Sequence, residues 1–375
     1  MPGRDLLLPL WLLLTGAMDV AASEPAVSIT VEVVAEGLQQ PWSLAFIDER
    51  RWLITERAGQ LRALLDGQLQ PPIGGVPTVH FAGQGGLLDV LIDPDFATNQ
   101  RLYLSYAHGD ATANATRVIR ARLVDQHLTD VRVLFTAQPS KATSVHYGGR
   151  LLMLPDGSLL LSLGDGFDER ESAQDLATHL GKIVRFGRDG EIPLDNPFSG
   201  RNDALPEIWT LGHRNVQGLS LDPLSGAVYA HEHGPRGGDE INRIEPGRNY
   251  GWPMATFGVD YSGALISPFQ RYPDTEAPLQ VWTPSIAPSA LAFVDGPQFA
   301  TWRGDLLVTA LAGKALHHLR RDDDGKLLEL PPLLAERQQR LRDVRMGPDG
   351  AIYVLTDGAD AQLLRLTPAP TNGPE

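Results

Sequence analysis

The sequence predicts an all-β protein built as a six-bladed β-propeller, and three observations lead to that prediction. A unit of two short apolar strands, joined by a turn that contains an acidic residue or proline, recurs along the chain. The units return at intervals of about forty to seventy residues, as propeller blades do. The segments between them are rich in Gly, Pro, Asn and Asp, which marks loops. A pair of β-sandwiches is the alternative architecture.

Each unit has the pattern of a β-hairpin. In residues 150–165, "RLLMLPDGSLLLSLGD", two apolar runs flank a Pro-Asp-Gly turn, which favours a hairpin. The six predicted units begin at Trp42, Leu87, Arg150, Gly218, Ser289 and Leu341. The segment from Ala26, "AVSITVEVV", is expected to complete the last blade.

The longest insertions cover about residues 166–211 and 245–284, and their composition predicts loops, with one short helical turn from Ser172. Propellers gather such loops on two faces around a central channel, where binding sites form. We therefore expect the functional residues in these connections.

Composition excludes several functions. Hydrophobic residues make up 42% of the chain and charged residues 21%, enough for a sizeable core. The formal net charge of -14 argues against a nucleic-acid partner, because phosphate binding requires a basic face. The chain has no cysteine, so disulfides, thiolate metal sites and covalent haem attachment are excluded.

The N-terminus predicts export. Arg4 precedes an apolar run from Leu6 to Ala17, and small residues follow at 21–23. This run is too short for a membrane span and fits a secretory signal peptide over residues 1–23, with an uncleaved anchor as the alternative. We expect a periplasmic or secreted protein that does not span the membrane, with a propeller over 24–367 and a disordered tail over 368–375. A monomer or a homodimer is expected.

His146 and Asp165 flank one predicted hairpin. His146 lies just before the first strand and Asp165 just after the second, so both are expected at the same end of the sheet. There an aspartate can hold a histidine as a positioned base. A solvated loop histidine is the alternative, and one hairpin does not decide between the two.

Polar and cationic residues precede other predicted strands. His213, Arg214, Asn215 and Gln217 cluster before one strand, and an arginine there offers a rigid fork of donors to a carboxylate or carbonyl. Lys314, Arg340 and Arg342 stand near later strands of this acidic chain. They predict a funnel for a small polyanion, although a solvated charged face would give the same pattern.

The segment 231–253 contains potential metal ligands. His231 and His233 would share one face of a strand, which is half of a zinc site, but no third ligand is evident. Gly234-Pro235 forms a turn with exposed carbonyls, and acidic residues follow closely. Hard oxygen ligands of this kind suit calcium.

Eight motifs in order carry a resemblance to a known family: "HYGGR", "GDG", "LGHRNVQGL", "EHGPRGGDEIN", "NYGWP", "WTPSIAPS", "LAGK" and "RLRD". Together they resemble the soluble aldose sugar dehydrogenases that use pyrroloquinoline quinone (PQQ). The similarity covers about residues 34–366. It implies a six-bladed propeller that oxidises aldoses at the anomeric carbon to lactones.

The resemblance also implies roles for particular residues. His146 would be the general base for the anomeric hydroxyl, and Asp165 would hold and polarise its imidazole. Arg214 would stabilise the oxyanion that grows on the quinone. Asn215 and Gln217 would line the same pocket.

The remaining implied roles concern cofactor, substrate and metals. The cofactor's carboxylates would be held by Lys314, Arg340 and Arg342, while Gln84 would touch cofactor or substrate and Trp282 would stack on the sugar. The resemblance implies two calcium ions. The carbonyls of Gly234 and Pro235 would bind the calcium ion at the quinone. Glu240 and Tyr250 would bind the second, structural calcium ion, with help from Tyr261.

Two competing functions remain. A calcium-dependent lactonase on a propeller would use carboxylates and amides around the metal and would not need the three cations. A non-catalytic binding propeller would not need a histidine and aspartate pair. Because the chain has no haem-attachment motif, a dehydrogenase would pass its electrons to an external acceptor.

Overall fold

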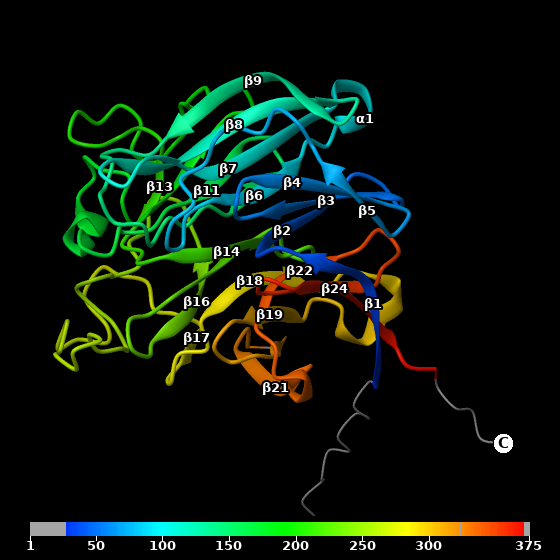
Figure 1. The fold of residues 1–375 in the computed structure, drawn as a ribbon. Helices are drawn as coiled ribbons and strands as arrows, with labels where there is room; N and C mark the ends of the chain where they lie inside the picture. The colour runs from blue at the N-terminus through cyan, green and yellow to red at the C-terminus, as the bar shows by residue number, and fades with distance from the viewer. Residues whose placement is uncertain (1–27, 323, 371–375) are drawn as a thin grey trace, which may run out of the picture.

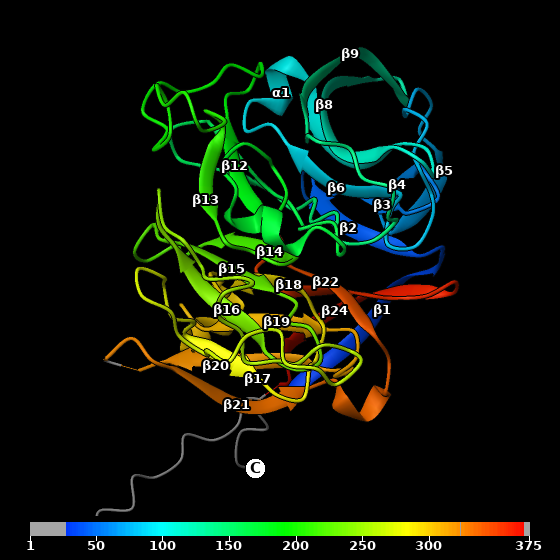
Figure 2. The same ribbon diagram turned by 90° about the vertical axis from the view of Figure 1, so that its left-hand side faces the viewer.

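The strands form six four-stranded antiparallel sheets around a central axis (Figure 1). The computed structural model describes residues 28–322 and 324–370. Innermost strands such as β2, β6, β14, β18 and β22 lie around the middle, and outer strands such as β5, β9, β13 and β21 lie at the periphery (Figure 2). The six-bladed propeller is confirmed. The signal peptide predicted over residues 1–23, and the tail from residue 371, lie outside the described residues.

The strands follow one another in chain order within blades 1–5, whereas blade 6 takes β1 as its outermost strand. Blade 1 contains β2 (Pro41–Phe46), β3 (Arg51–Glu56), β4 (Gln60–Leu65) and β5 (Gln68–Pro72); blade 2 contains β6 (Leu87–Ile92), β7 (Arg101–Gly109), β8 (Asn114–Val124) and β9 (His127–Thr136); blade 3 contains β10 (Leu151–Met153), β11 (Leu159–Ser162), β12 (Lys182–Phe186) and β13 (Ile208–Leu211). Blade 4 contains β14 (Val216–Leu221), β15 (Val228–Glu232), β16 (Asp239–Ile244) and β17 (Gln280–Trp282); blade 5 contains β18 (Pro288–Phe293), β19 (Leu306–Ala310), β20 (Leu316–Arg321) and β21 (Leu327–Leu333); blade 6 contains β22 (Leu341–Met346), β23 (Ile352–Thr356), β24 (Ala361–Pro368) and β1 (Ile29–Leu38). The helices are short: α1 (Phe96–Asn99), η1 (Arg170–Gln174), η2 (Pro297–Trp302) and η3 (Ala335–Arg337).

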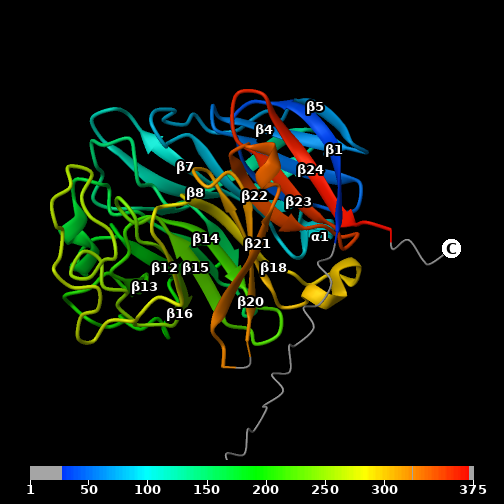
Figure 3. The same cartoon turned by 90° about the horizontal axis from the view of Figure 1, so that it is seen from below.

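The last blade joins the two ends of the described chain. β1 is the outermost strand of blade 6 and pairs antiparallel with β24, with Val33 opposite Leu364 (Figures 1 and 3). The expectation that the segment from Ala26 completes the last blade is confirmed for its described part. This pairing closes the ring, because the blade that ends the chain also takes a strand from its beginning.

The two long insertions are only partly loops. The first contains β12 and β13 as well as η1, which lies close to the predicted helical turn. The second contains β17, a strand of 3 residues. Prediction of loops there was wrong at these strands, because outer strands this short leave little apolar alternation to detect.

One buried arginine lies on the propeller axis. Arg150, immediately before β10, is 1% exposed. Its guanidinium lies 3.2 Å from Asp89 Oδ1 in blade 2 and 3.4 Å from Asp343 Oδ1 in blade 6. It also donates to the carbonyls of Gln217 in blade 4, at 3.0 Å, and Ser289 in blade 5, at 3.2 Å. The side chain therefore connects five of the six blades.

We expect Arg150→Met to lower the free energy of unfolding by about 3–5 kcal/mol, because the buried carboxylates of Asp89 and Asp343 lose one of their two cations and must then share Arg345. Urea unfolding measures the change. Arg365→Met is the matched control, since Arg365 pairs with Asp349 at the surface and such pairs contribute about 0–1 kcal/mol. Equal, small effects of both substitutions would show that Arg150 does not hold the blades together.

Candidate functional site

His146 and Asp165 form a buried pair on one face of the propeller. The face is the one from which every innermost strand starts, and we call it the site face. His146 Nδ1 lies 2.7 Å from Asp165 Oδ1, and the two residues are 4% and 1% exposed. A carboxylate can only accept, so Nδ1 carries the proton and Nε2 carries the lone pair. The hairpin prediction that these residues meet is confirmed, and the imidazole has the tautomer that a base requires.

The surroundings of the pair keep the imidazole neutral. Burial lowers the pKa of His146, and the nearby charge of Arg214 lowers it further, whereas the hydrogen bond to Asp165 opposes both. Burial raises the pKa of Asp165, but the hydrogen bonds from His146 and from the Phe167 N–H outweigh it, so this pKa is lowered overall. At neutral pH the pair is therefore a neutral imidazole beside an ionised carboxylate.

Trp252 is a third member of this arrangement. Its Nε1–H donates to Asp165 Oδ2 at 2.8 Å, while the N–H of Phe167 donates to Oδ1 at 2.8 Å. Both carboxylate oxygens are thus occupied, which fixes the plane of the carboxylate facing His146. Trp252 lies in the motif "NYGWP", but its contact with Asp165 was not predicted from the sequence.

The backbone of His146 is held in an unusual conformation. Its φ is +54°, in the left-handed region that residues other than glycine rarely adopt. Gln84 holds it there, because its Oε1 accepts the N–H of His146 at 2.8 Å. Lys141 Nζ donates to the neighbouring carbonyl of Val145 at 2.8 Å, and burial lowers the pKa of Lys141 to about 7. Gln84 therefore supports the loop of His146.

Arg214 lies beside the predicted calcium-binding turn. Its Nη1 donates to the carbonyl of Gly234 at 2.7 Å and to that of His233 at 3.1 Å. Its guanidinium lies over the rings of Trp252, at 5.4 Å, and Tyr261, at 5.9 Å. The arginine and the carbonyl predicted to bind a cation are therefore direct neighbours.

Asn215, which follows Arg214 in the chain, contacts the loop of His146 and the side chain of Gln217. Asn215 Oδ1 accepts from the N–H of Gly148 at 3.2 Å and from Gln217 Nε2 at 3.1 Å. Blades 3 and 4 are thus joined at the site face by the side chain of Asn215.

Two of the three predicted cations meet at a carboxylate. Arg340 Nε lies 2.8 Å from Asp357 Oδ2, and Arg342 Nη2 lies 3.0 Å from Asp357 Oδ1. Arg340 also reaches the carbonyl of Leu311 at 3.5 Å, in the loop that carries the exposed Lys314. Sequence reasoning missed Asp357, which orients both arginines.

His233 lies near residues from three blades. Burial, together with the nearby Arg214 and Arg342, lowers its pKa to about 3, while the hydrogen bond to the Pro288 carbonyl opposes this shift. His233 Nε2 donates to the carbonyl of Pro288 at 2.7 Å.

The predicted metal ligands fall into two separate cavities. Gly234, Pro235 and Tyr261 line one of about 580 Å³, and Glu240 and Tyr250 line another of about 290 Å³. The structure thus places Tyr261 beside the Gly-Pro turn and apart from the pair it was expected to assist.

The oxygen donors in these cavities are of the kind that binds cations, and Glu240 is an example. Burial raises the pKa of Glu240, and the nearby Glu232 raises it further, whereas the hydrogen bond from the Asn242 amide, at 3.3 Å, opposes this shift. A bound cation would remove that penalty. Within residues 28–322 and 324–370, no group of three His, Cys, Asp or Glu side chains is positioned to hold a metal, so the structure gives no support to a zinc site at His231 and His233.

Trp282 lies in the packing between blades 4 and 5. It is 7% exposed, its Nε1 donates to Glu329 at 3.0 Å, and its ring contacts His317. Little of the indole is open to a sugar, in contrast to the stacking role that the resemblance implies.

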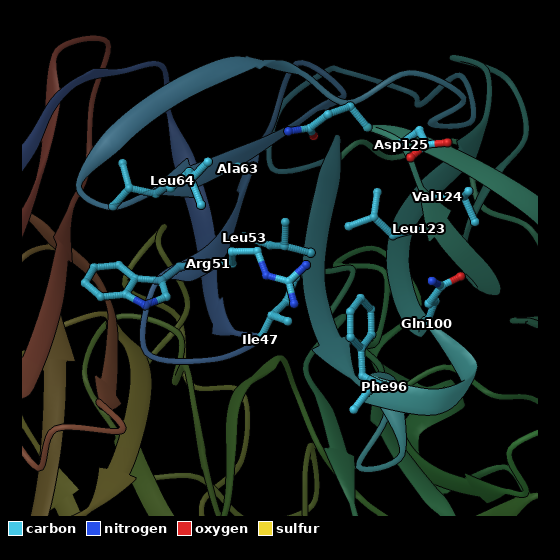
Figure 4. Close-up of a pocket in the computed structure, with 14 residues that line it drawn as sticks. Ile47, Arg51, Leu53, Ala63, Leu64, Phe96, Gln100, Leu123, Val124 and Asp125 are labelled. Carbon is cyan, nitrogen blue, oxygen red and sulfur yellow. The ribbon is translucent and has the colours of Figure 1, made fainter.

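A further cavity lies on the opposite face, between blades 1 and 2 (Figure 4). It has a volume of about 360 Å³ and a mixed lining, in which apolar residues such as Ile47 and Phe96 alternate with polar ones such as Arg51 and Asp125. These residues belong to turns and strand ends far from the site face, and none of the predicted site residues lines it.

Comparison with known proteins assigns the class of this fold and site. The sequence matches the Glucose / Sorbosone dehydrogenase family over residues 38–365. It is 44% identical to the aldose sugar dehydrogenase YliI of Escherichia coli, over 91% of this chain and 93% of that protein. The chain therefore belongs to the Glucose / Sorbosone dehydrogenase family and is a sugar dehydrogenase.

Solved structures agree with this assignment. The soluble aldose sugar dehydrogenase of Escherichia coli, in its apo-form, superposes with a TM-score of 0.88 at 43% identity, covering 91% of this chain and 100% of that one. The PQQ-bound aldose sugar dehydrogenase of Streptomyces coelicolor superposes with a TM-score of 0.75 at 27% identity, covering 92% and 99%.

We expect Trp252→Phe to raise the pKa of His146, because the carboxylate of Asp165 loses a donor that offsets its negative charge. The lost charge-assisted bond should also cost about 1.5–3 kcal/mol of stability. An NMR titration of the histidine ring measures the pKa, and urea unfolding measures the stability.

Trp52→Phe is the matched control for this substitution. The Nε1 of Trp52 is buried and has no hydrogen-bond partner in the described structure, so replacing it removes no bond. An unchanged His146 pKa in Trp252→Phe would show that the indole does not tune the pair.

Proposed function

We propose that this enzyme oxidises aldose sugars at the anomeric carbon to lactones, with PQQ as the hydride acceptor and calcium at the cofactor. The observation that carries the proposal is the neutral His146, held by Asp165 through Nδ1 and beside the cation Arg214. A base of this kind can take the proton of a hydroxyl while a hydride leaves the adjacent carbon. The PQQ-bound relative supports the identity of the cofactor.

The residues present fit a quinone that carries several carboxylates. Arg340 and Arg342, oriented by Asp357, and Lys314 would bind its carboxylates. The carbonyls of Gly234 and Pro235 would bind the calcium beside it, as hard oxygen donors.

A second calcium would be held at Glu240 and Tyr250. The hydroxyl of Tyr250 is already used, since it donates to the carbonyl of Arg243 at 2.7 Å and accepts the N–H of Glu245 at 2.9 Å. The carbonyl of Tyr250 would therefore be its ligand atom. Tyr261, which lines the other cavity, would contribute to the first site instead.

Side chains of the protein accept the proton of the substrate and stabilise the charges that develop. Nε2 of His146 takes the proton of the anomeric hydroxyl, and Asp165 stabilises the imidazolium that results. The hydrogen on the anomeric carbon leaves with its electron pair, and the lactone carbonyl forms. When bound, the quinone supplies the hydride acceptor and calcium polarises it as a Lewis acid. Arg214 places a fixed positive charge where negative charge develops.

The proposal also includes export of the protein and reoxidation of its cofactor. Export through a signal peptide over residues 1–23 would place the propeller, residues 24–367, in the periplasm or outside the cell. No helix among the described residues is long and apolar enough to cross a membrane. An external acceptor would reoxidise the cofactor.

Reconstitution tests the proposed reaction. Purified protein, freed of metal by a chelator, receives PQQ with or without calcium, a dye acceptor and a panel of aldoses. We expect dye reduction and lactone formation only with both additions, because the Gly234 and Pro235 carbonyls bind the cofactor through the metal. Inactivity toward every aldose in the loaded protein would contradict the proposal.

The second expectation concerns the base. His146→Ala should lower turnover by roughly a hundred- to ten-thousandfold, and Asp165→Asn by less, because the latter removes orientation but leaves the base. Activity should rise with pH as the imidazole loses its proton, with a midpoint below the ordinary histidine range. Stopped-flow reduction of the bound quinone measures the step.

His127→Ala serves as the control, since His127 is an exposed histidine at the start of β9 on the opposite face. Quinone reduction by His146→Ala within about threefold of the wild-type rate, well short of the loss expected for a base, would remove His146 from the reaction.

A further inference from the structure

Two exposed aromatic residues form a wall beside the base. Phe167 is 42% exposed and Tyr261 is 59% exposed. The ring of Phe167 meets the imidazole of His146 edge to face, with centroids 5.1 Å apart, and stacks on Tyr261 at 6.3 Å. We call Phe167 and Tyr261 the aromatic wall.

Packing does not account for Phe167. Its φ is +73°, in the left-handed region, which is a true outlier for a bulky side chain. Asparagine and glycine adopt this conformation more readily. The residue is nevertheless held there, by its N–H bond to Asp165, and its ring is presented to solvent. Strain of this kind is characteristic of functional positions.

We propose that the aromatic wall is the surface on which the aldose ring stacks. This inference rests on the proposed function and names the residues that place its substrate. A pyranose ring has an apolar face of C–H groups, which packs on an aromatic ring. A sugar on Phe167 would lie directly beside His146, so its anomeric hydroxyl can reach Nε2.

The position of the aromatic wall indicates that it contacts the sugar and not the cofactor. The cations assigned to the quinone, Arg340 and Arg342, belong to blade 6 and are oriented by Asp357. Phe167 follows Asp165 in blade 3 and contacts His146. Trp282, the stacking residue that the resemblance implies, is buried and bonded to Glu329. The wall is therefore the aromatic surface that lies open next to the base.

Phe167→Asn tests the proposal with the least disturbance to the backbone. We expect KM for D-glucose, and for any other aldose the enzyme oxidises, to rise roughly three- to tenfold, the range that a lost aromatic contact corresponds to. The kcat and the affinity for PQQ should not change, because His146 and the cation sites are intact. The melting temperature should not fall, since asparagine tolerates a positive φ.

Two further variants complete the design. Phe167→Tyr keeps the ring and should retain the wild-type KM. Phe269→Asn removes another aromatic side chain, 50% exposed, whose ring contacts Tyr272, and it should leave KM unchanged.

A binding measurement separates this inference from the proposed reaction. Saturation-transfer NMR on cofactor-free protein should show transfer to the ring protons of D-glucose in the wild type and less in Phe167→Asn. This signal does not require turnover, so it tests the wall even if no aldose is oxidised. Unchanged KM and unchanged saturation transfer would overturn the proposal. A loss of PQQ affinity with normal sugar binding, or a lower melting temperature with a proportional loss of kcat, would also overturn it.

Discussion

The geometry of the molecule depends on the buried ion cluster around Arg150. The arginine contacts blades 2, 4, 5 and 6 directly, and Asp343 extends the cluster to blade 1 by accepting the N–H of Leu44 at 2.9 Å. Every blade therefore has a fixed position relative to one side chain. Arg345 also pairs with Asp89 and Asp343, so removing any one of these charges would unbalance two cations and two carboxylates in a low-dielectric interior. The cluster therefore favours a single arrangement of the innermost strands.

The same arginine fixes the position of His146, because only the "YGG" turn separates the two residues. Gly148 has a φ of +63°, and a Cβ there would come within 2.5 Å of the carbonyl oxygen of Ser162. Gly149 has a φ of +99°, and a Cβ there would come within 2.5 Å of Leu88. The chain can turn this tightly from the axis to the site face only with glycine at both positions. His146 is thus anchored to the most constrained part of the fold.

What the sequence predicts and what it misses have separate physical causes. The inner hairpins, such as 150–165, combine apolar runs with a turn, so the six units and the closing strand were predictable. The outer strands β13 and β17 were not, since they have 4 and 3 residues. In the site, His146 and Asp165 could be paired because one hairpin joins them. Trp252 lies 87 residues from Asp165, and no local pattern signals that contact.

The strained backbone at His146 and Phe167 is maintained by the rigid hairpin that carries both residues. His146 and Phe167 both have positive φ, and both lie next to the Asp165 carboxylate. Residues held in such conformations cost about 1–3 kcal/mol each and persist only where their surroundings determine them. Here Gln84 and Asp165 accept the two backbone N–H groups, and the hairpin of β10 and β11 carries both loops. If the strands that carry these loops were flexible, the loops would relax to ordinary backbone angles. The imidazole of His146 would then separate from the ring of Phe167. The ion cluster on the axis therefore does more than stabilise the ring of blades: it allows the site face to keep a geometry that the local sequence would not adopt alone.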